Sequence, residues 1–333
     1  MSPIFCRWAA ALATVAIMAG CAPTNRNQPM HRFNEHTRTC GVGRFVVDIP
    51  AAMTFSGGYS FQGRKIEEIV WQDKEDPLNT WNHHIEKINR REAPKGVSSA
   101  LIEEREIAGI GVWCKTVLYF NEPLDPHYGA MDLLLNTGPT GLWIKAWDKK
   151  LSAKETIYEI STDIARAYRA PEKRFNRVEV VDGRDAFYLR YGAVDLPFEY
   201  KESVDIVFRE HALDDRLKIH IMTWVVHEEN KIGLLERAAN SLMMKLVGDL
   251  KIEKLRSGQR TVAGLPGEEL IERFTENGRN TLSFTWMHLG KKDSAHWPRV
   301  VVDMESRDGH LEEKLYLWDA LLDSMCAAGR QDR

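Results

Sequence analysis

Short runs of alternating apolar and polar residues fill most of the chain, which is the pattern of β-strands that bury one face. In the first half, two stretches have a different period, with apolar residues recurring every three or four positions. The first, residues 77–91, carries Trp81, Ile85 and Ile88 on one stripe, and the second ends before Pro171. Both stretches are therefore predicted to be amphipathic helices between clusters of strands.

The second half repeats this order of strands and helices. Strand-like runs lead to a helical stretch over 231–246, further strands follow, and a last helical stretch covers 312–328. Turn residues recur at a near-constant offset, as with Ala108-Gly109 and Ala263-Gly264. Clustered strands with few helices between them favour antiparallel sheets. We therefore predict an α+β fold of two similar modules, each a mainly antiparallel sheet with two helices, that arose by internal duplication.

The boundary between the modules is expected in the polar run over 170–177. The resulting modules cover residues 40–170 and 171–333, and each is long enough to bury a core of its own.

The N-terminus predicts export. Arg7 precedes an apolar run that is too short to span a bilayer, and the run ends at Met18-Ala19-Gly20-Cys21, which resembles a bacterial lipobox. We expect residues 1–20 to be a lipoprotein signal peptide and Cys21 to carry the lipid; the alternative is a plain secretory signal with an incidental cysteine. Residues 21–39 are polar and without period, so they are predicted to be a flexible tether.

Composition and charge limit the classes of molecule that this protein is expected to bind. The chain has 333 residues, of which 44% are hydrophobic and 28% charged, and its net charge is −3. Because there is no basic excess to neutralise phosphates, nucleic acid is not an expected partner.

The cysteines number five, an odd count that an exported protein must accommodate. Cys6 would leave with the signal and Cys21 would carry lipid. Of the remaining three, Cys40 and Cys114 lie in the same half and are predicted to form a disulfide, which leaves Cys326 on the last helix. Pairing through Cys326 is the alternative.

Motifs for catalysis and for metal or cofactor binding are missing from the sequence. It contains no G-x-S-x-G, no H-E-x-x-H and no P-loop. His83 and His84 are adjacent on a predicted helix and point about 100° apart, so they cannot both bind one metal ion from the same face. We interpret them as a surface pair, and we expect no enzyme activity, no metal and no cofactor.

Three residues are candidate contacts for a protein partner. Trp297 sits in the polar loop KKDSAHWPR, and loop aromatics often anchor interfaces. Its side chain folding back onto its own domain is the alternative. Asp214 and Asp215 lie at a predicted turn between two strands.

Two segments of the folded region, Thr39–Pro50 and Arg260–Glu269, resemble immunity proteins of the Tli type, which protect bacteria against type VI secretion lipase effectors. The run Leu317–Leu322 fits the same family. The resemblance implies a periplasmic protein, often a lipoprotein, with an N- and a C-terminal domain that binds a phospholipase effector and blocks its access to lipid. Members often carry Phe-Cys before the second module's Gly, whereas this chain has Phe175-Asn176, which leaves Cys326 without that partner.

The expected function is that of an immunity protein, monomeric when unbound, whose partner is the cognate lipase or phospholipase effector. Ala22 follows the lipidated cysteine, and the absence of Asp there resembles lipoproteins sorted to the outer membrane. The protein is therefore expected in the periplasm, held to the inner leaflet of the outer membrane. The alternative is a non-enzymatic envelope lipoprotein with a structural or assembly role.

Overall fold

The computed structural model describes residues 36–71, 76–171, 186–197, 201–229, 231–244 and 251–327. The predicted signal peptide, Cys21, nearly all of the tether and the expected module boundary after residue 171 lie outside these ranges. Below, the first half means the described residues up to 171, and the second half means those from 186 onward. Within the described ranges, no helix has the length and apolar character that crossing a membrane requires.

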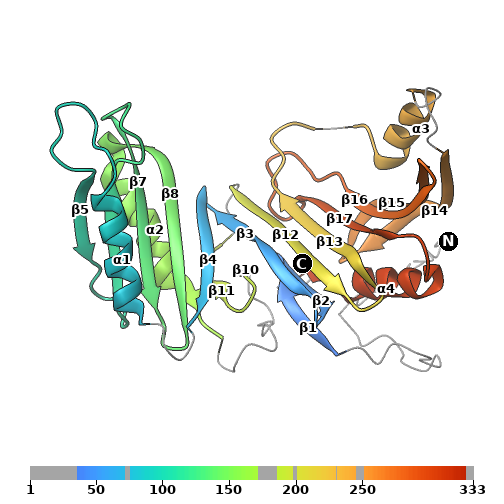
Figure 1. The fold of residues 1–333 in the computed structure, drawn as a ribbon, viewed down its shortest axis with the longest axis horizontal. Coiled ribbons are helices and arrows are strands. Elements are labelled where there is room, and N and C mark those ends of the chain that lie inside the picture. The colour runs from blue at the N-terminus through green and yellow to red at the C-terminus, as the bar shows by residue number, and fades with distance from the viewer. Residues whose placement is uncertain are drawn as a thin grey trace, which may run out of the picture. The chain divides into compact units, whose positions relative to one another are not determined.

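A single antiparallel sheet runs through both halves of the described chain (Figure 1). In spatial order its twelve strands are β14 (Lys251–Val262), β15 (Leu265–Glu276), β16 (Arg279–His288), β17 (Arg299–Arg307), β13 (Asp214–Trp224), β12 (Glu202–His211), β3 (Thr54–Phe61), β4 (Arg64–Val70), β8 (Thr140–Lys150), β7 (Tyr128–Asn136), β6 (Cys114–Tyr119) and β5 (Leu101–Glu106). The prediction of an α+β fold with mainly antiparallel strands is confirmed.

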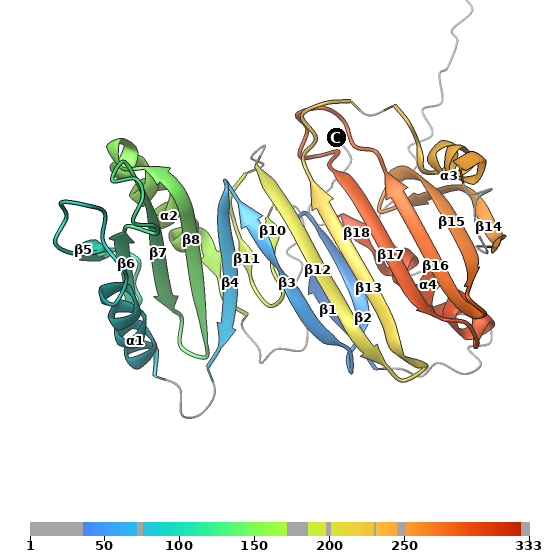
Figure 2. The ribbon, with the colours of Figure 1, turned by 45° about the horizontal axis from the view of Figure 1, so that its top comes forward.

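Strands β3 and β12 join the two halves at the middle of this sheet. They pair antiparallel along their length, with Gly57 opposite Ile206 and Gly58 opposite Asp205. Outward from this pair, the order is β3-β4-β8-β7-β6-β5 on one side and β12-β13-β17-β16-β15-β14 on the other. The two halves therefore place their strands in the same order along the chain and across the sheet, as Figure 2 shows for the central strands.

Each half contributes two α-helices, which are α1 (Pro77–Asn89) and α2 (Lys154–Ala167), then α3 (Leu234–Met244) and α4 (Leu311–Ser324). A short 3-10 helix, η1 (Leu151–Ala153), leads into α2. Helix α1 begins where the sequence predicts, because Asp76 caps the Leu78 N–H and Pro77 fits the first turn. Its stripe buries Trp81 and Ile88 against strands β6, β7 and β8, whereas α2 covers the other face of β7 and β8.

Two small sheets form a second layer. One consists of β1 (Thr37–Gly41), β2 (Phe45–Pro50) and β18 (Cys326–Ala327), and the other of β10 (Phe187–Tyr188), β11 (Ala193–Val194) and β9 (Tyr168–Arg169). Side chains of β2 share one core cluster with residues of β3 and β12 and with the buried side of α4. The main core thus lies between the large sheet and this layer of helices and short strands.

Candidate functional site

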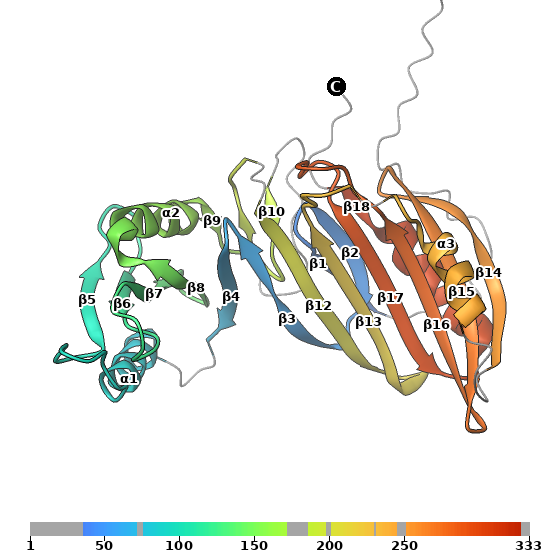
Figure 3. The same ribbon diagram turned by 90° about the horizontal axis from the view of Figure 1, so that it is seen from above.

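Among the described residues, no helix covers the middle of one face of the large sheet, as Figure 3 shows. Helix α1 packs on this face in the first half, and the start of α3 packs there on β15, where the Leu235 N–H donates to Glu268. Between the two helices, the strands alternate in burial: on β13, Leu217, Ile219 and Ile221 are buried, and the residues between them are half-buried. Alternation of this kind marks a sheet with one face on the core and the other accessible.

We call this surface the open face and define it by a central group of the outward residues of β3, β12, β13 and β17. They are Ser56, Gly58, Ser60, Ser203, Asp205, Val207, Lys218, His220, Met222, Trp224, Val301, Asp303 and Glu305. Strand β3 of the first half and three strands of the second half thus contribute to one continuous surface.

The centre of the open face is apolar. Met222 of β13 lies directly opposite Val301 of β17, and both are half-buried. Trp224 follows on the same side of β13, with the guanidinium of Arg299 5.6 Å from its ring centre. Methionine and tryptophan are suited to contact a partner, the first because it is flexible and polarisable and the second because of its area. Strand β3 presents only the small residues Thr54, Ser56, Gly58 and Ser60 on this side, so the surface is shallow there.

Charged groups surround this apolar centre. His220 Nε2 lies 2.8 Å from Asp205 Oδ1, and Lys218 Nζ lies 2.7 Å from Glu305 Oε2. Asp303 lies opposite His220 and accepts a hydrogen bond of 2.7 Å from Thr285 Oγ1. Burial raises the pKa of the Asp303 carboxyl, against the lowering effects of the Thr285 hydroxyl and His220. An apolar centre inside a polar rim is the usual composition of a protein interface.

The two predicted acidic contacts lie at the β12–β13 hairpin and differ from each other. Asp215 is exposed and forms an ion pair of 2.9 Å with Arg307. Asp214, by contrast, has a buried carboxylate that is used within the fold. It accepts the N–H groups of Arg216 and Arg307 at 2.9 and 2.6 Å, and the Lys314 ammonium lies 3.4 Å away. Burial alone would raise the pKa of Asp214, but these donors together lower it.

Trp297 is half-buried, and its ring packs against the main core. The ring centre lies 5.9 Å from that of His288, and the Lys291 ammonium lies 3.9 Å from it. The structure thus places the side chain on its own domain, which is the alternative that the sequence left open.

The histidine pair on α1 also differs from its interpretation. His83 is exposed, but His84 lies over the sheet, with Nε2 2.9 Å from Oδ2 of the buried Asp132. The Tyr119 hydroxyl donates to the same oxygen at 3.0 Å, and the Trp143 ring packs 4.9 Å from the imidazole. In the described ranges, neither His84 nor His220 is hydrogen-bonded to a hydroxyl or thiol that would serve as a nucleophile.

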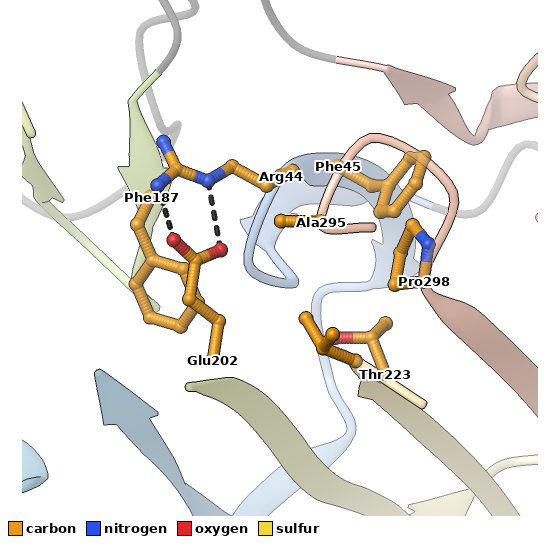
Figure 4. A pocket seen from close by; sticks show the side chains of 8 residues that line it. Arg44, Phe45, Phe187, Glu202, Thr223, Ala295 and Pro298 are labelled. Atoms are coloured by element: carbon orange, nitrogen blue, oxygen red, sulfur yellow. Dashed lines mark hydrogen bonds and ion pairs between the residues drawn. The ribbon is translucent and has the colours of Figure 1, made fainter. Parts of the chain in front are cut away.

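A small cavity lies beside the buried ion pair of Arg44 and Glu202, with Phe187 and Pro298 in its lining (Figure 4). Its volume is about 10 Å³, which is room for at most one water molecule. It is therefore too small to hold a substrate. Nor does any group of three or more His, Cys, Asp or Glu side chains within the described part of the chain have an arrangement suited to a metal ion.

The predicted disulfide is absent from the structure, since Cys40 and Cys114 are both free thiols. Cys40 lies on β1 in a small sheet, whereas Cys114 opens β6, the second strand from one edge of the large sheet. Burial raises the pKa of Cys40 to about 11 and that of Cys114 to about 12, so both are protonated and unreactive at neutral pH.

Sequence reasoning missed the residues of the open face. Met222, Trp224 and Val301 lie in runs whose pattern predicts ordinary strands. The sequence does contain one signal. On β13 the apolar residues Met222 and Trp224 lie on the same side of the strand as the polar residues Lys218 and His220. Apolar residues that neighbour one another on the polar side of a sheet can form an apolar surface patch.

Comparison with known proteins shows that part of the chain is similar to a known family. Residues 189–326 match the family described as Tle cognate immunity protein 4 C-terminal domain. No curated protein sequence matches the chain.

Solved structures share its fold over most of their length. A chain of the crystal structure of the Tle4–Tli4 complex is 19% identical, with a TM-score of 0.70, covering 89% of this chain and 99% of that one. The apo immunity protein TplEi of the type VI secretion system (T6SS) from Pseudomonas aeruginosa is 19% identical, with a TM-score of 0.68 and coverage of 89% and 98%. The structure of the same protein complexed with "L" peptide is 21% identical, with a TM-score of 0.64, and the match covers 89% of this chain and 99% of that one. The resemblance to Tli-type immunity proteins is therefore confirmed.

Proposed function

We propose that this chain, whose residues 189–326 match the Tle cognate immunity protein 4 C-terminal domain, is an immunity protein. It binds and inhibits a type VI secretion lipase or phospholipase effector in the periplasm, and so protects the cell from its own and its siblings' toxin. The family match carries the proposal. The fold supports it, because similar chains include TplEi and a chain of the Tle4–Tli4 complex.

Inhibition by binding requires a complementary surface and no reaction on the inhibitor's side. We assign this role to the open face, because it combines a half-buried apolar centre with paired charges around it. Both halves of the chain contribute to it, so one effector would contact both at once. A stable complex buries roughly 1,600 Å² in total, and the effector's access to lipid would be blocked by this contact.

A matched pair of variants tests the assignment. Met222→Glu places a charge at the centre of the open face. Tyr316→Glu places the same charge on the exposed side of α4, which packs on the opposite face of the sheet. We expect Met222→Glu to weaken binding to the cognate effector by roughly 30-fold or more, as for an interface hot spot, whereas Tyr316→Glu binds as the wild type does.

The measurements are calorimetric affinity for the effector encoded beside this gene, and survival of cells that send that effector to the periplasm. Equal affinity and equal protection by both variants would show that the open face is not the contact surface. If the wild-type chain neither binds the effector nor protects the cell, the immunity function fails for that pair, and a structural envelope role gains support.

Lipid anchoring is a further part of the proposal and concerns residues outside the described ranges. Cys21, as the lipid-bearing N-terminus of the mature chain, would hold the protein to the inner leaflet of the outer membrane. A flexible tether to residue 39 would have a root-mean-square reach of about 25 Å. Cys21→Ser is expected to move the protein from the membrane fraction to the soluble periplasm and to leave effector binding by purified protein unchanged. Membrane retention of the variant would contradict this.

We also propose that the chain arose by duplication of one α+β module, with modules at 40–170 and 171–333, and that it is monomeric when unbound. The identical strand order of the two halves supports the duplication. So does a shared anchor, since an arginine of each edge strand binds a carboxylate of the last helix of its own half. Arg105 of β5 contacts Glu155 of α2, and Arg256 of β14 contacts Asp319 of α4.

A further inference from the structure

We infer that the two halves of this chain have exchanged their opening β-hairpins, so that the second layer of each half is completed by strands of the other. Hairpin β1–β2 opens the first half but pairs with β18, the last strand of the second half. The β10–β11 pair opens the second half but pairs with β9, the last strand of the first half. This inference concerns the architecture and does not depend on the proposed function.

The first crossing joins β2 to the end of the chain. Val46 lies directly opposite Cys326 in an antiparallel pair, and the two share a small apolar cluster. The N–H of Asp48 donates to the Ser324 hydroxyl at 3.0 Å, and β2 also packs against α4. The layer behind the second half's strands therefore contains a hairpin that is encoded in the first half.

The second crossing repeats this arrangement on the other side. Ala193 of β11 lies opposite Arg169 of β9, and the Asp195 N–H donates to the Ala167 carbonyl at 2.9 Å. The turn before β11 is held by Glu68 of β4, whose carboxylate accepts the N–H groups of residues 191 and 192 at 2.8 and 2.7 Å. In both crossings, a strand that directly follows a half's last helix pairs with the opening strands of the other half.

Close backbone contact shows where the exchanged segments pass each other. The Gly41 N–H donates to the Leu189 carbonyl at 3.1 Å, and Gly43 forms a bridge with Tyr188. A Cβ at Gly41 would lie 2.2 Å from the Leu189 oxygen, so only glycine allows the approach. The two opening segments thus lie side by side, and each continues to the opposite half.

The exchange has a consequence for folding. A chain cut at the module boundary would leave the second layer of each half incomplete, with apolar surface exposed. The modules at 40–170 and 171–333 are therefore not expected to fold alone, although each has its own strands and helices. Exchange of identical elements is known between protomers, and duplication would fuse such a pair into one chain.

Cross-linking the full-length chain tests the inference. Val46→Cys places a thiol opposite the native Cys326, and directly opposed residues have Cα atoms about 4.5–5.5 Å apart, within the range of a disulfide. A specific protease site is placed within residues 172–185, so that cleavage yields two fragments. The matched control is Val46→Cys with Arg169→Cys and Cys326→Ser, the pair that would meet if the hairpin stayed with its own half.

After oxidation at low protein concentration and cleavage, we expect the first variant to run mostly as two fragments joined by a bond that reductant breaks. The control is expected to give separated fragments without a 46–169 disulfide on peptide mapping. A 46–169 disulfide in the control, together with separated fragments in the first variant, would overturn the inference.

A second pair keeps the test decisive if Val46→Cys does not fold. Ala193→Cys with Arg169→Cys, in a Cys326→Ser background, places two thiols opposite each other across the other crossing. Their disulfide must also join the two fragments if the hairpins are exchanged, and fragments that separate would contradict the exchange.

Discussion

Replacing Glu202 with alanine is expected to destabilise the protein more than most single substitutions. Arg44 is only 5% exposed, and its Nε donates to Glu202 Oε2 at 2.9 Å while a second nitrogen contacts the other carboxylate oxygen. The guanidinium also lies 5.8 and 5.9 Å from the ring centres of Phe61 and Phe187. Without the carboxylate, a buried positive charge would lose its counter-charge.

The magnitude follows from this burial. Removing one partner of a buried, hydrogen-bonded ion pair costs about 3–5 kcal/mol, because the remaining charge is desolvated and uncompensated. Arg44 would still donate hydrogen bonds to the carbonyl oxygens of Leu196 and Pro197 at 3.0 and 3.1 Å. The expected loss of stability therefore lies toward the lower end of this range. With about 2 °C of Tm for each kcal/mol in a chain of this size, Tm falls by roughly 6 °C or more.

Urea and thermal unfolding followed by circular dichroism measure the effect, with Glu202→Gln and the double variant Arg44→Met/Glu202→Met beside it. The double variant removes both charges, so it is expected to be more stable than Glu202→Ala. The reasoning is refuted if Glu202→Ala loses less than about 1 kcal/mol, the value typical of an exposed pair, or if the double variant is the less stable one.

Two further predictions concern the contacts expected from the sequence. The pKa of Asp214 is lowered in the folded state, so its stabilising contribution is present above the unfolded pKa of about 4 and is lost as the pH falls through the folded value. Asp214→Asn should therefore flatten the acid side of the stability profile, measured as urea midpoints against pH, and profiles that stay parallel would argue against this role. Trp297→Ala should lower the free energy of unfolding by about 1–2 kcal/mol, less than for a fully buried aromatic residue, and leave effector affinity unchanged. A tenfold loss of affinity at unchanged stability would instead support its first assignment as a partner contact.

Local features of the fold were readable in the sequence because they depend on near neighbours. The stripe of Trp81, Ile85 and Ile88 predicts a helix over residues 77–91, and the structure has α1 there, with Asp76 as its N-cap. The alternation of apolar and polar residues predicted the β-strands for the same reason, because each strand that buries one face shows this alternation in its own sequence.

The residues of the candidate site were harder to identify from the sequence. His84 and Asp214 look like surface residues in the sequence, yet each meets a buried or packed partner from a distant segment. Met222 was the reverse case, since an apolar residue in a strand is ordinarily assigned to the core. Whether a given face is covered depends on where the helices pack, and in the described part of the chain α1 and α3 do not cover the middle of the sheet.

By itself, the sequence determined the α+β class, the helix stripes, the repeated order of elements and the likeness to immunity proteins. Only the tertiary structure decided that β3 and β12 join both halves into one sheet and that the opening hairpins pair across the halves. The physical reason is that periodicity states which face of a strand is buried but not which strand lies beside it. Backbone hydrogen bonds are alike at every position, so the choice of neighbour depends on how all the apolar faces are buried together.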